Sequence, residues 1–523
     1  MTTGYLTQAQ LADFAIFQGE LLNASEEIAE IIKDDEASDF KISAAVGEEY
    51  YNCEHDIIKR TITVAIEGET VTLANAANNQ IVHPLHKIFV DQKAAYIAGK
   101  PLTVSVMMPE VEDPKNLTPK EEAETNEALN FNASISAILD EDFDDILNEW
   151  IVSASNSGCG FLHVYIGKAE EDSTYSVGPF RFVVIPTGQC IPRYNPKYQR
   201  ELDGFVRHYE YDIVQDGVTY TRKKFEWWTK TDVTYWIQGL DNIYRLDPDY
   251  ETNPAPHWSE TTSTPGAANT VKGMSWGKVP FIPLPNNKAW TSDLVPVKTL
   301  IDAIDLVKSD WCNDLEEFQE LVYVIKNFSG NETYSEILKN LKSYKLIKVS
   351  DNGGVETIRA EVPVEARLQF INLTKKEAYA FGQAVDIDSD KLGNNPSGVS
   401  LQFVYSHLDM KANVLIRKLM KALKDFSCFL TFYVNMAEKK QYDYRRIVFT
   451  VNKSQIFNEV EKMQALNTDT LLSEHTKLSN HPLVNDVDDE ERRKDSEAEA
   501  SALKGVVSLD NADDTDPNAD ESI

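Results

Sequence analysis

Three aspartates in one irregular segment have the spacing of a cation-binding loop. Asp386, Asp388 and Asp390 match positions one, three and five of the calcium loop of an EF-hand, where carboxylates surround one ion. Position six of that loop is glycine and position twelve is glutamate, but this chain has Lys391 and Ser397 there. We therefore interpret the segment as an acidic loop that is either solvated or lines the axis of a ring of subunits. We predict no metal site.

Two other groups of residues could do chemistry but are better explained as structure. His83 and His86 flank Pro84 and Leu85 and do not match a zinc knuckle, so we interpret them as ordinary histidines at a helix start. Ser397 lies in a Pro-Ser-Gly sequence instead of the Gly-x-Ser-x-Gly turn of hydrolases, and the chain has no Walker-type phosphate loop. We predict no cofactor. Because the Walker-type loop is missing from the sequence, any ATP hydrolysis that the function requires must be done by another protein.

The acidic pairs Glu141-Asp142 and Asp144-Asp145 could be the carboxylates of a glycosidase. Adjacent acids before an amphipathic stretch also favour the N-terminal end of a helix dipole. We prefer the second interpretation, a solvated helix start.

An aromatic group made of Trp227, Trp228, Tyr235 and Trp236 could stack on bases or sugars. These residues alternate along expected strands, and large aromatic side chains in that pattern usually fill a sheet core. We predict that they do so here.

The chain has 523 residues and is strongly acidic. It carries 84 Asp and Glu against 51 Lys and Arg, a formal net charge of −33. This charge argues against a protein that grips nucleic acid by neutralising phosphates, so any contact with DNA should be weak. Residues 486–523 alone hold 14 acids and 4 bases with few large apolar residues, and we predict that this tail is disordered.

Cysteine usage and hydropathy indicate an intracellular protein that is neither exported nor inserted in a membrane. The five cysteines are odd in number and widely spaced, which argues against a disulfide framework or a zinc site. The N-terminus lacks a basic region followed by an apolar core, and no run of about 18 apolar residues occurs.

Residues 1–290 are expected to form a mixed region that is rich in sheet from residue 160. Acid-rich residues 109–124 are predicted to form a surface loop. Residues 251–275, rich in Thr, Ser, Pro and Gly, are predicted to form a flexible excursion. Helical periodicity is found over 5–40, within 75–100 up to a turn at Gly99, and over 127–155.

Two amphipathic helices flank a small unit in the second half of the chain. The first is predicted over 294–318, and the second begins at Pro363. The unit between them has the pattern strand, helix, strand, turn, strand, which is typical of a compact α/β module and suggests a protrusion. The apolar faces are predicted to be Leu300, Ile304, Trp311, Leu315 and Phe318 on the first helix and Val364, Leu368, Ile371, Ala378 and Phe381 on the second.

The third helical pattern is the most regular. From Val399 onward, apolar residues such as Leu408, Leu415 and Leu419 recur at steps of three and four, which predicts about seven turns of helix. The acidic segment described first lies between this helix and the one that begins at Pro363.

Five segments of the chain together resemble the portal proteins of tailed bacteriophages, in the branch typical of siphophages that infect Gram-positive bacteria. No single segment is diagnostic, but all five occur in the order that such portals have. They are HKIFVDQKAAYIAGKPLTV at 86–104, WGKVPFIPLPNN at 276–287, LVPVKTLIDAIDLVKSDWCNDLEEF at 294–318, FGQAVDIDSDKLGNNPSGVSLQFVYSHLDMKAN at 381–413 and TLLSEHTKLSNHPLVND at 470–486.

The resemblance implies an α+β, multidomain ring subunit with long helices and a sheet-rich wing. The ranges that it implies are a wing at 1–290, stem helices at 291–318 and 363–383, a clip at 319–362, a tunnel loop at 384–398, a long wing helix at 399–442, a helical crown at 443–485 and the acidic tail at 486–523.

Two candidate functional surfaces follow from the same resemblance. The tunnel loop would face DNA with Asp386, Asp388, Asp390, Lys391, Asn394 and Asn395. The clip would dock partners through Tyr334, Glu336, Lys339, Lys342 and Tyr344.

The implied function is not enzymatic. A ring of about twelve subunits would stand at the unique capsid vertex, conduct DNA during packaging and ejection, and nucleate head assembly. Its implied partners are double-stranded DNA in non-specific, transient contact, the terminase large subunit, a head-completion or adaptor protein, and the major capsid and scaffolding proteins, with no membrane. The protein would be assembled in the host cytoplasm and reside in the virion.

Two other classes of protein also fit the sequence. An acidic carbohydrate-active enzyme with a helical appendage would need a cleft with paired carboxylates and should be close to monomeric. A non-portal virion adaptor would share the ring but lack a tunnel loop between two helices.

Overall fold

The computed structural model combines helices with sheets, which confirms the mixed fold expected from the sequence. Two compact units are distinguished, residues 1–386 with 407–454 and residues 387–406 with 455–523. The division falls within helix α10, Gly398–Glu438. Among the residues that the structure describes, the short helix α12, Glu474–Ser479, is the only element wholly in the second unit. The residues described are 21–66, 69–72, 76–111, 117–139, 141–167, 178–198, 201–215, 217–239, 241–262, 270–317, 322–326, 333, 354–358, 363–386, 398–454, 468, 471–479, 481, 484, 487, 490–494 and 496.

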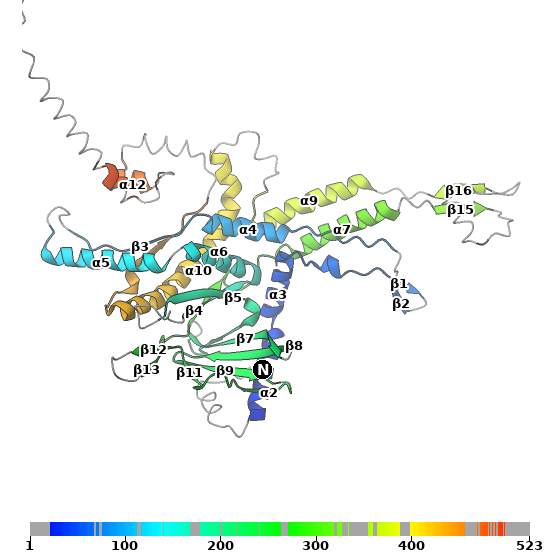
Figure 1. Ribbon diagram of the computed structural model, residues 1–523. Coiled ribbons are helices and arrows are strands. Elements are labelled where there is room, and N and C mark those ends of the chain that lie inside the picture. The colour runs from blue at the N-terminus through cyan, green and yellow to red at the C-terminus, as the bar shows by residue number, and fades with distance from the viewer. Residues whose placement is uncertain are drawn as a thin grey trace, which may run out of the picture. The chain divides into compact units, whose positions relative to one another are not determined.

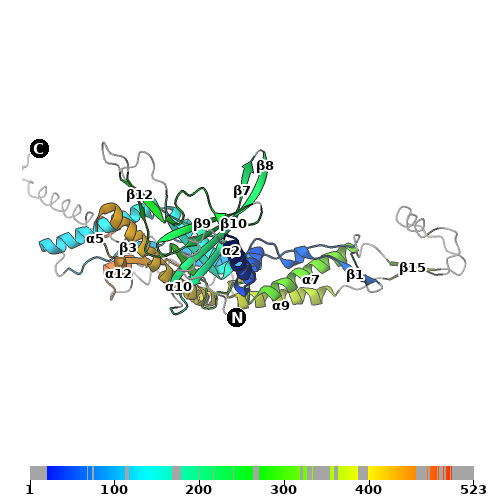
Figure 2. The same ribbon diagram turned by 90° about the horizontal axis from the view of Figure 1, so that it is seen from below.

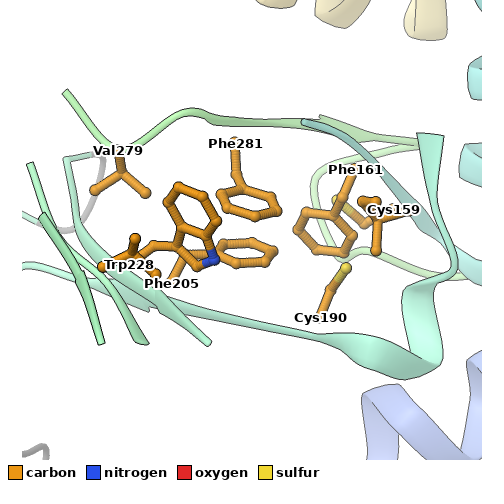
Figure 3. Packing of buried hydrophobic residues seen from close by; sticks show 9 residues of the cluster. Cys159, Phe161, Cys190, Phe205, Trp228, Val279 and Phe281 are labelled. Carbon is orange, nitrogen blue, oxygen red and sulfur yellow. The ribbon is translucent and has the colours of Figure 1, made fainter. Parts of the chain in front are cut away.

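Two antiparallel sheets form the main core of the first unit. Phe205 of one sheet stacks on Phe281 of the other with ring centroids 3.9 Å apart, and Phe161 meets Phe205 edge-on (Figure 3). Such aromatic packing between inner faces holds two sheets together. The strand orders are β14-β4-β5 and β10-β9-β8-β7-β6, with β11 beside β9. The bounds are β4 Cys159–Ile166, β5 Phe180–Ile185, β6 Cys190–Tyr194, β7 Leu202–Gln215, β8 Val218–Trp228, β9 Asp232–Gln238, β10 Tyr244–Leu246, β11 Ala255–Pro256 and β14 Phe281–Pro285.

The aromatic group on β8 and β9 fills the sheet core, as predicted. Trp228 and Tyr235 belong to the core between the two sheets. Trp227 and Trp236 lie on the opposite face of the larger sheet, where Ile28 of helix α2 (Leu21–Glu36) covers them. Adjacent residues of a strand point to opposite faces, so one aromatic group serves two cores.

The prediction of a flexible excursion over 251–275 is wrong in part. Besides β11, this range contains strand β12, Trp258–Thr262, paired antiparallel with β13, Thr270–Met274. Trp258 is buried against Trp276, with ring centroids 4.4 Å apart. The threonines that suggested a linker are also good strand formers, and the buried tryptophan decides in favour of the hairpin.

The predictions for 109–155 need two corrections. Helix α5, Pro119–Ile138, begins inside the expected surface loop, because Thr118 and Glu121 form a capping box and proline occupies the first turn. The single helix expected over 127–155 is two helices, since α5 ends at Leu139 and α6 spans Glu141–Ser157. The acidic residues at 141–145 do begin a helix, as predicted.

The helical stretch expected over 5–40 is also divided. Within the described residues α2 ends at Glu36, and Ser38 caps the next helix, α3, Asp39–Tyr51. Helix α4, Leu85–Ala98, ends at Gly99 as predicted, and strand β3, Thr103–Val106, follows. The remaining small elements are η1 Asp56–Lys59, β1 Thr63–Ile66, β2 Glu69–Thr72 and η2 Thr187–Gln189.

Strand β3 pairs with β17, Ile447–Thr450, from the far end of the sequence. A short turn, η3 Tyr444–Arg446, precedes β17. These residues lie in the range expected to be a helical crown, so the start of that range is extended instead of helical. The pairing partner, 341 or more residues away, is what selects a strand here.

Helix α10 follows the predicted pattern closely. Leu408, Leu415, Leu419 and Phe426 are all at most 2% exposed. The helix ends at Glu438, a little before the expected limit. Within the described residues no helix is both long enough and apolar enough to cross a membrane.

Helices α7, Lys298–Glu317, and α9, Val364–Gly382, correspond to the two predicted flanking helices. They lie side by side, green and yellow-green in Figure 1, and Figure 2 gives the same arrangement. Between them in sequence, strands β15 Val322–Lys326 and β16 Gly354–Ile358 form an antiparallel hairpin. The other elements predicted for the small unit lie outside the described residues.

Candidate functional site: the paired helices and the loop between them

Helices α7 and α9 are joined to the body by an apolar core at one end. Ile301 and Ile304 of α7 and Ala378 of α9 are buried together with Phe89 of α4 and Tyr50 of α3. Burying large apolar side chains contributes about 1.5–3 kcal/mol each. This core therefore fixes the end of the helix pair that is attached to the body.

Each predicted apolar face is buried in one part and exposed in another. Ile304, Ile371 and Ala378 are buried. A helix that leaves the body keeps its amphipathic pattern, but in a single chain it has mainly its partner helix to pack against. Residues of the predicted faces that are instead exposed are Leu315 on α7 and Val364, Leu368 and Phe381 on α9.

An extended segment before α4 is bound along α7 by three hydrogen bonds from its backbone. The amide nitrogens of Asn79, Ile81 and His83 donate to side chains of α7 at 2.6, 2.9 and 2.8 Å. Alternate residues of extended chain repeat about every 6.6 Å and every fourth helical residue about every 6 Å, so the two spacings nearly match. The acceptors are Asn313, Ser309 and Asp305, all buried.

Asp305 also binds two histidines. Its carboxylate oxygens lie 2.6 Å from Nδ1 of His55 and 3.0 Å from Nδ1 of His83. Burial by itself would raise the pKa of Asp305, but the hydrogen bonds from both histidines outweigh it and lower that pKa. The charged form of Asp305 is therefore favoured at this end of the helix pair.

The His-Pro-Leu-His segment lies at the start of α4, as predicted. His86, in the first turn, is fully buried. Burial lowers its pKa to about 4, so the ring is neutral at pH 7. In the part of the chain that the structure describes, no group of three or more His, Cys, Asp or Glu residues is placed to hold a metal ion.

A buried ion cluster connects four helices at the root of the pair. Asp293, just before α7, accepts from Lys93 of α4 at 3.0 Å and from Lys411 of α10 at 3.1 Å. Asn286 accepts from Lys93 at 2.5 Å and donates to Asp293 at 2.9 Å. Lys411 also donates to the carbonyl of Gly382, at the end of α9, at 2.8 Å. We call Lys93, Asp293, Lys411 and Asn286 the root cluster.

The charges of the root cluster depend on one another. Burial alone would raise the pKa of Asp293, but Lys411 and Lys93 hold it well below its usual range. Burial lowers the pKa of Lys93 to about 8 even though Asp293 acts in the opposite direction. Asp293 therefore favours the charged form of the buried Lys93.

The first residues of the loop after α9 are also anchored. Gln383 takes a left-handed conformation with φ 54° and ends the helix. The side chain of Gln92 donates to the carbonyl of Val385 at 2.9 Å and accepts from its amide at 3.0 Å. Gly382 is required here, because a Cβ would lie 2.8 Å from the ring of Phe89. The position of Val385, where the loop begins, is therefore fixed by Gln92.

Only one of the predicted loop residues is described. Asp386 directly follows the anchored segment and is partly exposed. The remaining predicted loop residues and all predicted clip residues lie outside the described part of the chain. They are Asp388, Asp390, Lys391, Asn394 and Asn395 in the loop and Tyr334, Glu336, Lys339, Lys342 and Tyr344 in the clip.

Sequence reasoning missed the root cluster. One signal was present, because Lys93 lies on the same helix face as Phe89 and Ile97, at steps of four. A lysine on an apolar face must find a buried partner. Nothing in the local sequence identifies Asp293 and Lys411 as that partner.

Comparisons with known proteins identify the family of this chain. The sequence model of the family described as "Phage portal protein, SPP1 Gp6-like" matches residues 32–503. The portal protein of Bacillus phage SPP1 is 32% identical over 485 residues, which cover 90% of this chain and 88% of that protein. The portal protein of Clostridium phage phiCD119 is 28% identical over 485 residues, covering 92% and 97%.

Among solved structures, a chain from the neck of a native GTA particle covers 77% of this chain and 90% of its own length. Its identity is 11% and its TM-score 0.36, too low to establish a common fold.

The match over most of the chain and the two full-length relatives define a class, the portal proteins of tailed bacteriophages. The chain belongs to the SPP1 Gp6-like family of these portals. This confirms the resemblance found in the sequence, including its branch, since the relatives come from phages of Bacillus and Clostridium. Membership of this family implies a component of the virion.

Replacing Lys93 by Met should destabilise the protein by about 3–5 kcal/mol, because the substitution leaves a buried charge cluster incomplete. Lys120→Met is the matched control, since the Lys120 side chain is 85% exposed and its pair with Glu124 is 3.7 Å long. The control should cost less than about 1 kcal/mol. Chemical unfolding followed by tryptophan fluorescence measures both, and equal costs would contradict a structural role for the cluster.

Replacing Gln92 by Ala should release the start of the loop without unfolding α9. Loss of the two hydrogen bonds to Val385 should speed hydrogen exchange of its amide by on the order of tenfold. Exchange in the middle of α9, at Ala378, serves as the internal reference. If both amides accelerate equally, Gln92 stabilises the helix as a whole and does not specifically anchor the loop.

Proposed function

We propose that the protein forms a ring of about twelve subunits at the unique capsid vertex and conducts DNA during packaging and ejection. The observation that carries this proposal is the family match over residues 32–503. In this reading α7 and α9 form the stem, with the clip and the tunnel loop at its two ends. The proposed ranges are wing 1–290 with 399–442, clip 319–362, tunnel loop 384–398, crown 443–485 and acidic tail 486–523.

Exposed apolar side chains on both stem helices support the ring. Leu306 on α7 is 44% exposed, and Leu373 and Phe381 on α9 are 59% and 58% exposed. In a closed ring each subunit offers two different surfaces to its neighbours, so apolar residues are needed on more than one face. Neighbouring stems would bury the side chains that a single chain leaves in water.

The net charge supports a conduit that does not hold DNA. Duplex DNA carries about one charge per 1.7 Å of axis, so a strongly basic channel would bind it tightly. Twelve chains of −33 would carry 12 × −33 = −396 formal charges. In the tunnel loop, the aspartates would repel the duplex while Lys391 makes brief contact with phosphates.

The remaining parts of the proposal concern partners. The chain contains no Walker-type phosphate loop, so the energy for packaging would come from the terminase large subunit docked at the clip. After packaging, a head-completion protein would use the same projecting surface. Contacts of wing and crown with major capsid and scaffolding proteins would let the ring nucleate the procapsid.

An acidic carbohydrate-active enzyme is a weaker proposal. Such an enzyme needs two carboxyl groups that face each other across a cleft. Of the acids at the start of α6, Asp144 accepts from the backbone amide of Leu102 at 3.1 Å and so has a structural role. A non-portal adaptor is disfavoured by the family to which the chain belongs.

The purified full-length chain should form closed rings of about twelve subunits with an axial hole. Native mass spectrometry measures the number of subunits, and negative-stain microscopy shows the hole. A uniform monomer under the same conditions would reject the ring and favour the enzyme.

Changing Asp386, Asp388 and Asp390 together to Lys should slow DNA packaging, because a basic constriction would hold phosphates that an acidic one repels. We expect a loss of rate of about tenfold or more at low salt, recovering as salt is raised. The control carries the same change of charge on helix α2, with Glu26, Glu30 and Asp34 changed to Lys. An unchanged rate in the loop variant, measured by nuclease-protected DNA in an in vitro packaging reaction, would refute the repulsion argument.

A further inference from the structure

The exposed face of helix α10 is basic in its central turns. Arg417, Lys421 and Lys424 are exposed, and they share one face because residues three and four apart are neighbours on a helix. No Asp or Glu occurs between Asp409 and Asp425, in a chain with 84 acids. We call Arg417, Lys421 and Lys424 the basic stripe.

The basic stripe forms no salt bridge among the described residues, although Asp425 interacts electrostatically with Lys421. None of its three side chains forms a salt bridge or a side-chain hydrogen bond there. Lys411, on the same helix, is bound to Asp293 at 3.1 Å. Burial raises the pKa of Asp425 while Lys278 and Lys421 act in the opposite direction, so this carboxyl group offsets part of the charge of the stripe. The three exposed cations still outnumber it, in a chain with 33 excess negative charges.

Helix α6 carries a stripe of the opposite sign. Asp142, Asp145 and Glu149 are exposed at steps of three and four, and the helix contains no Lys or Arg. None of the three forms a salt bridge within the described part of the chain. Burial raises the pKa of Glu149, and Asp145 raises it further, as expected for acids without a nearby cation. We call these residues the acidic stripe.

The two stripes match in length but do not meet within one chain. Each spans eight residues, about 10 Å from first to last at ~1.5 Å per residue. Helices α6 and α10 touch through Phe143 and Phe426, whose ring centroids are 5.8 Å apart. The apolar faces of the two helices are therefore used inside the subunit, while both charged faces are left for contacts with other molecules.

We propose that the basic stripe of one subunit binds the acidic stripe of the next subunit in the ring. The proposal rests on the ring proposed above and names a contact that helps to close it. Chains of −33 repel one another, so an interface between them needs local opposite charges. Each subunit carries one stripe of each sign, which is the arrangement that a repeating, heterologous contact requires.

Apolar residues beside the basic stripe extend the same surface. Met410 and Val414 precede it on α10 and are 54% and 36% exposed, and Phe432 follows it at 38%. An apolar border would exclude water from the ion pairs and strengthen them. A neighbouring protein surface fits this border better than DNA does, because phosphates offer nothing apolar to cover it.

A second acidic stripe provides a matched control. Glu26, Glu30 and Asp34 on α2 are exposed at steps of four. This stripe is less suited to the role because Lys33, also exposed, lies beside it. Changing either acidic stripe to Lys alters the net charge equally, so a specific contact can be separated from bulk charge.

The test compares ring assembly of four full-length variants with that of the wild type at about 0.15 M salt. The first is Arg417→Glu with Lys421→Glu and Lys424→Glu, and the second is Asp142→Lys with Asp145→Lys and Glu149→Lys. The third combines these two sets. The fourth combines the first set with Glu26→Lys, Glu30→Lys and Asp34→Lys. Mass photometry gives the concentration at which half of the chains are in rings.

We expect each single reversal to raise that concentration by about tenfold or more, and the third variant to restore it to within about threefold of wild type. The fourth variant should stay impaired. If the wild type forms rings and the single reversals do so equally well, the pairing is overturned and the ring proposal stays intact. The same holds if the α2 set, and not the α6 set, restores assembly. Absence of rings in the wild type would overturn the ring proposal itself.

Discussion

One buried carboxylate determines how the helix pair is attached to the body. Asp293 binds Lys93 and Lys411 at 3.0 and 3.1 Å, and through them it connects the start of α7 with α4, α10 and the end of α9. Removing three charges from water is costly, and the cost is offset only when every partner is in place. The cluster therefore tolerates one arrangement of these four helices, which gives the attachment specificity more than net stability.

The position of the helix pair α7 and α9 follows from that constraint. The apolar core around Ile301 fixes the attached end of the helix pair, and the backbone of residues 79–83 binds the polar face of α7. At the other side of the root, Gln92 holds Val385, so the loop that begins at residue 386 starts from a defined position. Farther out, both helices keep apolar side chains in water, which a single chain cannot bury. The helix pair is well packed where it joins the body and exposes apolar side chains along its sides, which fits the proposed ring.

The distribution of charge has two consequences in the proposed assembly. An excess of 33 negative charges per chain keeps a conduit from binding a polyanion, but it also makes neighbouring subunits repel one another. The basic stripe on α10 would offset the repulsion between subunits without making the conduit basic, because its cations lie together on one face of one helix. Subunits would attract one another at these local contacts, while the channel wall would repel DNA. The same acidic composition could then serve both ring assembly and DNA conduction.

The sequence by itself was sufficient for the long helices, most strands, the aromatic sheet core and the family, because these depend on local periodicity or on short segments in a fixed order. It did not reveal the break at Leu139, the hairpin around Trp258 or strand β17, since each is decided by a capping group or a distant partner. The root cluster is the clearest case. Lys93 and Asp293 are 200 positions apart, and charged residues at such positions normally face solvent. Only the tertiary structure brings them together, because removing water from one charge is favourable only when another is already there.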